Sequence, residues 1–229
     1  KYKAVALRRG IDKDSGERRK MLGVLASPDG IHWKRLEENP AIREGSFDSL
    51  NTPFWDPHLE KYVCYTRGGH DGLRAIQRTT SKDFLQWSEP QWLEYTPPQE
   101  HQYYTNAISL YERAPRLYLG FPMRFVPSRT TIGREARAID GTSDAVMISS
   151  RDGVTFQRTF QRAFLRPGPN PDNWGNAHGN NTLANGMVKT APGELSLYWF
   201  ENYGDVPRLR RGTIRADGFA SLRAGGERG

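Results

Sequence analysis

The chain has 229 residues, enough for a single all-β domain with a substantial core, and a formal net charge of +7 at pH 7. It has no run of about 18 apolar residues, which excludes a membrane-spanning helix, and its single cysteine, Cys64, excludes an internal disulfide. Basic residues are scattered among acidic ones without a basic stripe or a zinc-finger spacing, so we do not expect nucleic-acid binding.

Short alternating or apolar segments predict strands along the whole chain, and no segment has sustained helical periodicity. In chain order the predicted strands are residues 2–6, 20–26, 49–55, 61–65, 103–111, 116–120, 144–149, 181–189 and 195–199. Glycine (23 residues) and proline (15 residues) separate these segments at short intervals. The pattern predicts an all-β fold in which Cys64 is a small, buried strand residue.

A turn motif of the form Ser-x-Asp, three further residues and an aromatic recurs between the strands. The complete copies are residues 27–33, 81–87 and 150–156, with a degenerate copy at 215–219. Their aspartates recur at intervals of 54, 69 and 65 residues and are Asp29, Asp83, Asp152 and Asp217. In such a turn the aspartate accepts backbone N–H bonds and the aromatic side chain packs on the neighbouring strand. We therefore expect Asp29, Asp83 and Asp152 to be structural and not catalytic.

The interval between copies matches a four-stranded unit with variable loops. Four-stranded units with this period are typical of β-propellers, in which each unit is a blade and its first strand lines the central channel. The first unit lacks an inner strand, so we expect about four blades here and an N-terminal part of the ring to be missing. The predicted units of this single domain are residues 1–45, 46–98, 99–170 and 171–229.

These residues carry a family likeness. The repeated turn resembles the Asp-box of sialidases, while residues 46–57, 61–67 and 214–222 are similar to five-bladed propellers of the glycoside hydrolase 32/43 type. The resemblance implies a five-bladed β-propeller with acidic residues on inner strands at one mouth of the channel. It also implies three carboxylates, of which the first would lie upstream of Lys1, and it favours a secreted or periplasmic location.

Glycoside cleavage requires two carboxyl groups beside the scissile bond. Asp48 precedes an inner strand and is followed by polar and aromatic residues suited to a sugar. Glu100 occupies the equivalent place one unit later, next to His101, which is expected to modulate its pKa. We therefore expect Asp48 and Glu100 to be catalytic.

Further charged residues are expected to bind the substrate. Asp144 begins the third strand of its unit after a polar loop, and Asp56 lies in an Asp-Pro step for which a turn role is the favoured alternative. Arg67 and Arg124 each end the second strand of a unit. Each is expected to bind a substrate carboxylate or a catalytic acid, and the alternative is a pairing with a surface acid.

Neutral and aromatic side chains complete the predicted pocket. Amide and imidazole groups suit sugar hydroxyls, and aromatic rings stack on the C–H faces of pyranoses. The candidates are Asn51, Trp55, Tyr103, Tyr104, His178, Asn180 and Asn181.

No histidine or acidic cluster has the spacing of metal ligands and no glycine-rich phosphate loop is present, so we expect neither a metal nor a cofactor. The sequence predicts a glycoside hydrolase that acts on a poly- or oligosaccharide. The alternative is a non-catalytic carbohydrate-binding propeller, because the fold hosts both uses. The basic charge favours an anionic sugar as the partner.

Overall fold

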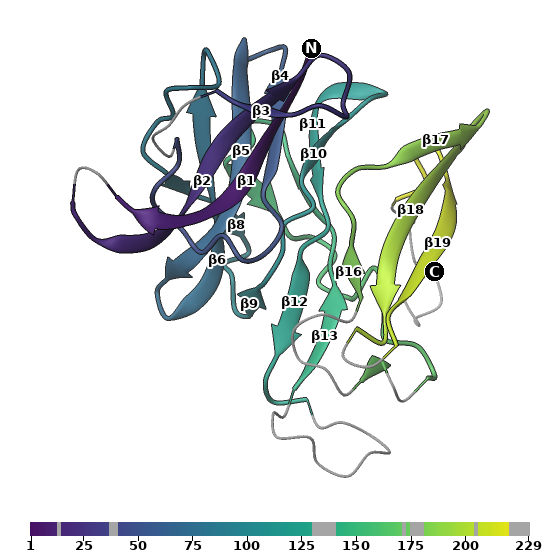
Figure 1. Ribbon diagram of the computed structural model, residues 1–229. Coiled ribbons are helices and arrows are strands. Elements are labelled where there is room, and N and C mark those ends of the chain that lie inside the picture. The colour runs from purple at the N-terminus through teal and green to yellow at the C-terminus, as the bar shows by residue number, and fades with distance from the viewer. Residues whose placement is uncertain are drawn as a thin grey trace, which may run out of the picture.

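The computed structural model is all-β, as the sequence predicts (Figure 1). It describes residues 1–12, 15–36, 41–129, 141–170, 173–174, 181–203 and 206–219. Within these residues the strands form five sheets. No helix in the described part of the chain has the length and apolar character needed to cross a membrane.

Two sheets are built from the first 92 residues. The first contains β1 (Tyr2–Ile11), β2 (Arg18–Ser27) and β3 (Lys34–Arg35), in that order. The second contains β4 (Thr52–Asp56), β5 (Lys61–His70), β6 (Leu73–Ser81) and β7 (Gln91–Trp92), again in chain order. Both sheets are antiparallel throughout, as expected for strands joined by short turns.

The middle of the chain forms two sheets. The five-stranded sheet has the order β10 (Ser109–Tyr111), β11 (Ala114–Gly120), β14 (Ile148–Ser150), β15 (Thr155–Gln157) and β8 (Glu94–Thr96). The three-stranded sheet has the order β13 (Thr142–Ala145), β12 (Met123–Val126) and β9 (Gln102–Tyr103). In the last sheet the central strand is β18 (Glu194–Glu201), which pairs with β16 (Thr182–Leu183), β17 (Val188–Ala191) and β19 (Arg208–Arg215).

Three predicted strands are interrupted. The segment 144–149 divides between β13 and β14, because Val146 faces Pro122, which has no N–H to continue the ladder, and Ala145 bonds to Leu165 instead. The segment 103–111 divides between β9, which ends at Tyr103, and β10, which begins at Ser109; Ala107 between them has a φ of 42°. The segment 181–189 divides into β16 and β17.

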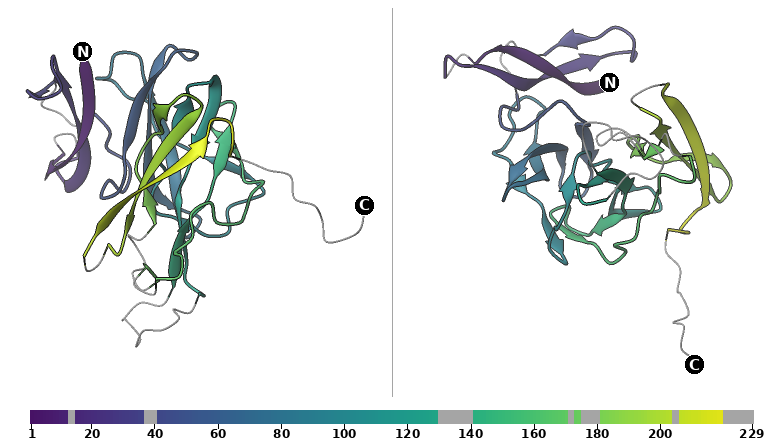
Figure 2. Two further views of the ribbon diagram at one scale, coloured as in Figure 1. Left: turned by 90° about the vertical axis from the view of Figure 1, so that its right-hand side faces the viewer. Right: turned by 90° about the horizontal axis from the view of Figure 1, so that it is seen from below.

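Three hydrophobic clusters join four of the sheets in the order first, second, five-stranded and last. Leu22 and Cys64 join the first sheet to the second, and burial raises the pKa of the Cys64 thiol. Tyr65 and Phe156 join the second sheet to the five-stranded sheet. Leu119 and Leu197 join the five-stranded sheet to the last one. Seen from below, the sheets follow one another around the molecule, which is the succession that a propeller requires (Figure 2).

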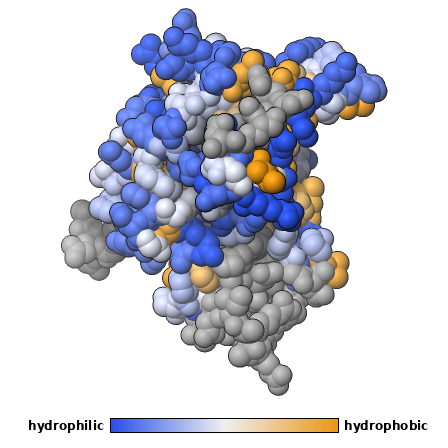
Figure 3. All heavy atoms as spheres, turned by 60° about the vertical axis from the view of Figure 1, so that its left-hand side comes forward, coloured by the Kyte–Doolittle hydropathy of each residue, from blue (hydrophilic) through white to orange (hydrophobic). Residues whose placement is uncertain are grey.

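The surface is polar where the first two sheets come forward. In that view small hydrophobic spots are scattered over a mostly hydrophilic face (Figure 3). Isolated exposed apolar residues of this kind are ordinary on a protein surface and do not indicate a docking site.

The three complete turn motifs have the predicted structure. Oδ1 of Asp29 accepts the N–H groups of Ile31 and His32, both at 2.8 Å. Asp83 and Asp152 accept the equivalent pairs of N–H groups at the same distance. In the second copy the N–H groups of Gln86 and Leu85 lower the pKa of the Asp83 carboxyl. The aspartates therefore hold turns.

The degenerate fourth copy is built differently. The Asp217 carboxylate accepts the hydroxyl of Tyr111 at 2.6 Å and pairs with Arg113 at 2.9 Å. It thus ties the end of β19 to the hairpin of β10 and β11 and leaves the turn N–H groups to other partners.

The third motif also connects two sheets. The buried Tyr65 hydroxyl of β5 donates to the carbonyl of Gly153 at 2.7 Å, and Arg78 of β6 donates to the carbonyl of Asp152 at 2.9 Å. Gly153 has a φ of 73° and packs so closely that an added Cβ would lie 2.7 Å from the Tyr65 hydroxyl oxygen and 2.8 Å from Cζ of Tyr118. Gly30, at the same place in the first motif, has a φ of 86° and no such crowding.

We predict that Gly153→Ala destabilises the fold far more than Gly30→Ala. Both substitutions place a Cβ at positive φ, which costs about 1 kcal/mol, and only the first adds overpacking of a further 1–3 kcal/mol or so. Phe84 occupies the equivalent position in the second motif at a φ of 72°, so the turn itself accepts a side chain. Equal losses of unfolding free energy in urea denaturation would contradict the docking role of the third motif.

Candidate functional site

Asp48 lies at the centre of a charged cluster, here called the Asp48 cluster, which consists of Lys20, Asp48, Arg67 and Tyr104. The half-exposed carboxylate of Asp48 forms an ion pair with Nη2 of Arg67 and lies 3.9 Å from Nζ of Lys20. The Arg67 guanidinium lies over the ring of Tyr104, 4.3 Å from its centre. Residues from three sheets therefore meet here: Lys20 belongs to β2, Arg67 to β5, and Tyr104 directly follows β9.

The strand β5 fixes Arg67 in this cluster. Its side chain is buried, and its carbonyl accepts the N–H of Ser46 at 2.6 Å, which holds the loop before β4 against β5. The guanidinium is thus rigid when it meets Asp48, and such charge-assisted contacts orient a carboxylate well. The predicted pairing of Arg67 with a candidate catalytic acid is present.

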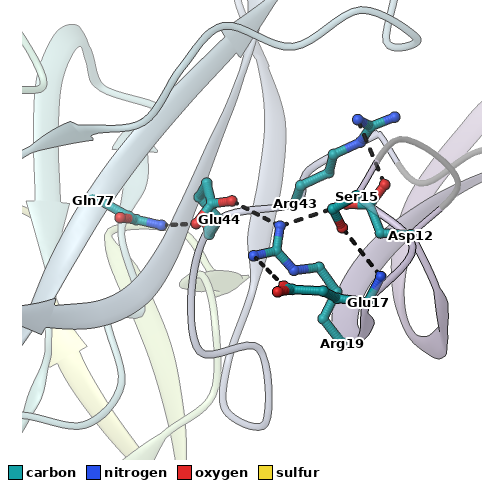
Figure 4. Close-up of polar contacts among 7 residues, drawn as sticks. All are labelled: Asp12, Ser15, Glu17, Arg19, Arg43, Glu44 and Gln77. Atoms are coloured by element: carbon teal, nitrogen blue, oxygen red, sulfur yellow. Dashed lines mark hydrogen bonds and ion pairs between the residues drawn. The ribbon is translucent and has the colours of Figure 1, made fainter.

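A second network supports the segment that leads to Asp48 (Figure 4). The Asp12 carboxylate is buried and lies 3.5 Å from Nη1 of Arg19 and 3.7 Å from Nη1 of Arg43. Arg19 also pairs with Glu44 at 3.1 Å, and Gln77 of β6 donates to the Glu44 carbonyl at 2.6 Å. These contacts connect the hairpin of β1 and β2 to the second sheet, a few residues before Asp48.

Glu100 is exposed on a segment that is fastened to β6. Gln99 donates to the carbonyl of Arg74 at 2.9 Å, and the Arg74 guanidinium binds the side-chain oxygen of Gln102. Arg74 also lies over the Tyr104 ring, 5.8 Å from its centre. The segment from Glu100 to Tyr104 is therefore held next to the Asp48 cluster by the second sheet.

Arg124 and Asp144 form a buried pair one sheet further along. They face each other across β12 and β13, where Nε and Nη2 of Arg124 bind the two carboxylate oxygens at 2.8 and 2.7 Å. Arg129 adds a contact to Asp144 at 2.6 Å. Because both of its carboxylate oxygens are bound, Asp144 orients two arginines and has no oxygen free to contact a substrate.

Four residues that were predicted to bind the substrate are not members of the Asp48 cluster: Asn51, Trp55, Asp56 and Tyr103. Tyr103 is buried in the core against Tyr95, so it has no free ring face, whereas the next residue, Tyr104, is half-buried. Asp56 is fully buried and accepts the N–H groups of His58 and Leu59 and the hydroxyl of Tyr118. It therefore has the turn role, which is the alternative to substrate binding.

Trp55 and Asn51 have local roles. The Trp55 ring packs edge-on against the Tyr62 ring, with 4.9 Å between the ring centres. It lies near the Asp56 end of β4, and the strand is about 13 Å long. Asn51 donates from Nδ2 to the carbonyls of Phe47 and Ser49, both at 3.1 Å, and so shapes the loop that carries Asp48. The candidates His178 and Asn180 lie outside the described residues.

Asn106 is a residue that the sequence analysis did not identify, and it joins the segment of Tyr104 to that of Asp48. Its buried side chain donates to the carbonyls of Leu50 at 2.8 Å and Tyr65 at 3.2 Å. Its Oδ1 accepts the Thr52 hydroxyl at 2.8 Å and the Ile108 N–H at 3.3 Å. A signal exists in the sequence, because Asn51, Asn106 and Asn181 each lie in the predicted first strand of a unit.

We predict that Asn106→Asp lowers the unfolding free energy by about 3 kcal/mol, because two buried carbonyls lose a donor and face an acceptor. The control is Asn185→Asp, the same change at an exposed asparagine, which is expected to cost less than about 0.5 kcal/mol. Urea denaturation measures both, and equal midpoints would refute a connecting role for Asn106.

The electrostatic environment of His101 gives a pH prediction. Burial and then the Arg124 charge lower the pKa of His101 below its usual 6.5, with a further contribution from Arg129, while Glu100 opposes them. A depressed pKa means that neutral His101 supports folding above pH 6.5 and that this support is lost as the pH falls through the folded-state pKa.

We expect the NMR titration of the His101 ring to have its midpoint below 6.5 and to move upward in Arg129→Gln, because one repelling charge is removed. Arg151→Gln, at an exposed site in the third turn, is the control and is expected to leave the midpoint unchanged. A normal midpoint in the unmodified protein would show that His101 does not face these arginines.

No protein-family model matches the chain, and no curated protein matches it in sequence. Solved structures do match its fold. An N-acetylgalactosamine deacetylase from F. plautii, in complex with blood group B trisaccharide, has a TM-score of 0.64 at 13% identity, over 95% of this chain and 70% of that one. A structure described as a glycoside hydrolase has a TM-score of 0.58 at 16% identity, over 91% of this chain and 61% of its own.

A third similar structure is the GH32 β-fructofuranosidase of Bombyx mori, with a TM-score of 0.53 at 10% identity. The match covers 90% of this chain and 41% of the silkworm enzyme, so the chain spans less than two thirds of two of these three proteins. At these identities the likeness concerns the fold. The predicted resemblance to the propellers of glycoside hydrolases is therefore confirmed at the level of architecture.

Proposed function

We propose that the chain belongs to a propeller glycoside hydrolase that cleaves a poly- or oligosaccharide with Asp48 and Glu100. The observation that carries this proposal is the Asp48 cluster, in which an accessible carboxylate, a fixed guanidinium, a lysine and an aromatic ring meet from three sheets. Fold similarity to carbohydrate-active proteins supports it. The first sheet, the second sheet, the five-stranded sheet and the last sheet, which pack in that order, supply the blades of the proposed ring.

Asp48 is assigned the role that needs a negative charge, as nucleophile or base. Its carboxylate is 43% exposed, so that a ligand can reach it, and Arg67 orients it from the buried side. An ion pair with a guanidinium suits a group that acts as a carboxylate. A catalytic acid, by contrast, must hold a proton near neutral pH.

Glu100 is assigned the role of the general acid. It is exposed, on a segment fastened to β6, and it lies four residues before Tyr104, whose ring touches the guanidinium that binds Asp48. The half-buried Tyr104 ring is the proposed platform for a sugar, because aromatic faces pack against pyranose C–H groups. The distance between the two carboxyl groups would decide between retention and inversion.

One observation favours the second candidate, a carbohydrate-binding propeller without catalysis. Asp48 is flanked by two cations, Arg67 and Lys20, and such pairing weakens a carboxylate as a nucleophile. In that case the same cluster would bind sugar hydroxyls through the carboxylate and the guanidinium, and Glu100 would have no role in bond cleavage.

The test is a screen of the full-length protein against diverse glycans, followed by Asp48→Asn and Glu100→Gln. Each substitution is expected to lower kcat/KM by about 10²–10⁴ on the glycan that is cleaved, because each removes one acid–base group. The matched controls are Asp71→Asn and Glu89→Gln, both at exposed sites, and they are expected to keep full activity. Unchanged turnover in both test variants would reject the assignment, and binding without turnover of any glycan would establish the second candidate.

A further inference from the structure

A cavity of about 740 Å³ lies beside the Arg124–Asp144 pair, between the strands β12 and β13 and the segment 161–169. We call it the arginine pocket and define it by Arg124, Arg129, Asp144, Arg162, Arg166 and Trp174, all of which line it. Its size is in the range of pockets that hold small ligands. Four guanidinium groups are gathered at its wall.

The charges of this pocket do not balance. Asp144 is its one carboxylate among the described lining residues, and Arg124 and Arg129 already occupy both oxygens. Arg162 and Arg166 are exposed, and neither forms an ion pair with a described residue. Among the residues that the structure describes, the pocket thus presents two guanidinium groups without an acidic partner beside a pair of arginines that are held in place.

The positive charge has an effect outside the pocket. Burial is the largest cause of the lowered pKa of the nearby His101, and the charges of Arg124 and Arg129 lower it further, as expected for a ring in a positive potential. The same potential would attract an anion. Guanidinium groups suit carboxylates and sulfates in particular, because their planar N–H donors match two oxygens at once.

An aromatic ring borders the same space. The indole N–H of Trp174 donates to the Gly168 carbonyl at 2.8 Å, which holds the ring at the wall of the pocket. Arg124 is also anchored by a bond to the Gln161 carbonyl at 2.9 Å, so the segment 161–168 and β12 are joined. A fixed ring beside cations suits a ligand with an apolar face and an acidic group.

From this arrangement we infer that the arginine pocket binds the acidic group, a carboxylate or a sulfate ester, of an anionic saccharide. Arg162 and Arg166 bind the oxyanion, while Arg124 and Arg129 are oriented by Asp144 and maintain the positive field. The inference rests on the proposed function insofar as the ligand is a saccharide. It adds the substrate class, since neutral sugars would leave Arg162 and Arg166 without a partner.

The test compares three probes by calorimetry: a uronic-acid tetrasaccharide, the same tetrasaccharide with its carboxylates reduced to alcohols, and a sulfated tetrasaccharide. We expect the acidic probes to bind at least about tenfold more tightly than the reduced one, as charge-assisted contacts are lost on reduction. Whichever acidic probe binds more tightly identifies the group. The double variant R162Q/R166Q is expected to lose this preference.

The control double variant, R116Q/R151Q, removes two exposed arginines that do not line the pocket and is expected to keep the preference within about twofold. Melting temperatures of both double variants verify that they are folded. Equal binding of the acidic and the reduced probes overturns the inference, as does an unaltered preference in R162Q/R166Q. Competition by a single-stranded oligonucleotide of equal charge at equal affinity also overturns it, in favour of nucleic-acid binding.

The failure of this inference differs from a failure of the proposed function. If the pocket does not select acidic groups, hydrolysis that depends on Asp48 and Glu100 would persist without any preference for acidic probes. If the protein is not a hydrolase, the preference measured by calorimetry would stand while no probe is cleaved.

Discussion

The buried side chain of Asn106 is the interaction on which the candidate site depends. It places all of its hydrogen-bonding capacity between the loop before β4, the strand β5 and its own segment. The loop carries Asp48, β5 carries Arg67, and the segment carries Tyr104. One amide therefore holds together the pieces of backbone that carry Asp48, Arg67 and Tyr104, and a buried polar group that is fully satisfied also fixes their relative position.

The turns and the core act at the other end of the same sheets. Tyr65 illustrates the coupling, because its carbonyl accepts a bond from Asn106 while its hydroxyl reaches Gly153 in the third turn. Its ring lies in the cluster that joins the second sheet to the five-stranded one. The candidate site is thus connected through β5 to the third turn.

Local chemistry explains what the sequence predicts well. The roles of Asp29, Asp83 and Asp152 depend on their near neighbours in the chain, so the motif alone is enough to assign them. Long-range placement is harder. Tyr103 and Tyr104 are adjacent, and alternation puts one ring in the core and the other at the surface, but the sequence does not state which. Asp48 precedes β4 and Asp56 ends it. Only the three-dimensional structure shows that Asp48 pairs with Arg67 and that Asp56 accepts the hydroxyl of Tyr118.

The arginines show the same limit. The sequence predicts that Arg67 and Arg124 meet acids, and both do. Arg129 follows β12 and is near Arg124 in the chain, but Arg162 and Arg166 join these two only through the packing of a segment beyond β13. Scattered basic residues in a sequence can therefore converge in space. The net charge of +7 does not itself indicate where an anion would bind, whereas the arginines gathered at the pocket do.

A crystal structure of the protein with a non-cleavable acidic oligosaccharide tests the central claim most directly. The account predicts a sugar ring on Tyr104, with the carboxyl groups of Asp48 and Glu100 on either side of the glycosidic oxygen and about 5–10 Å apart. It also predicts the acidic group at Arg162 and Arg166. A ligand bound elsewhere, or the two carboxyl groups facing away from each other at a greater separation, would contradict it.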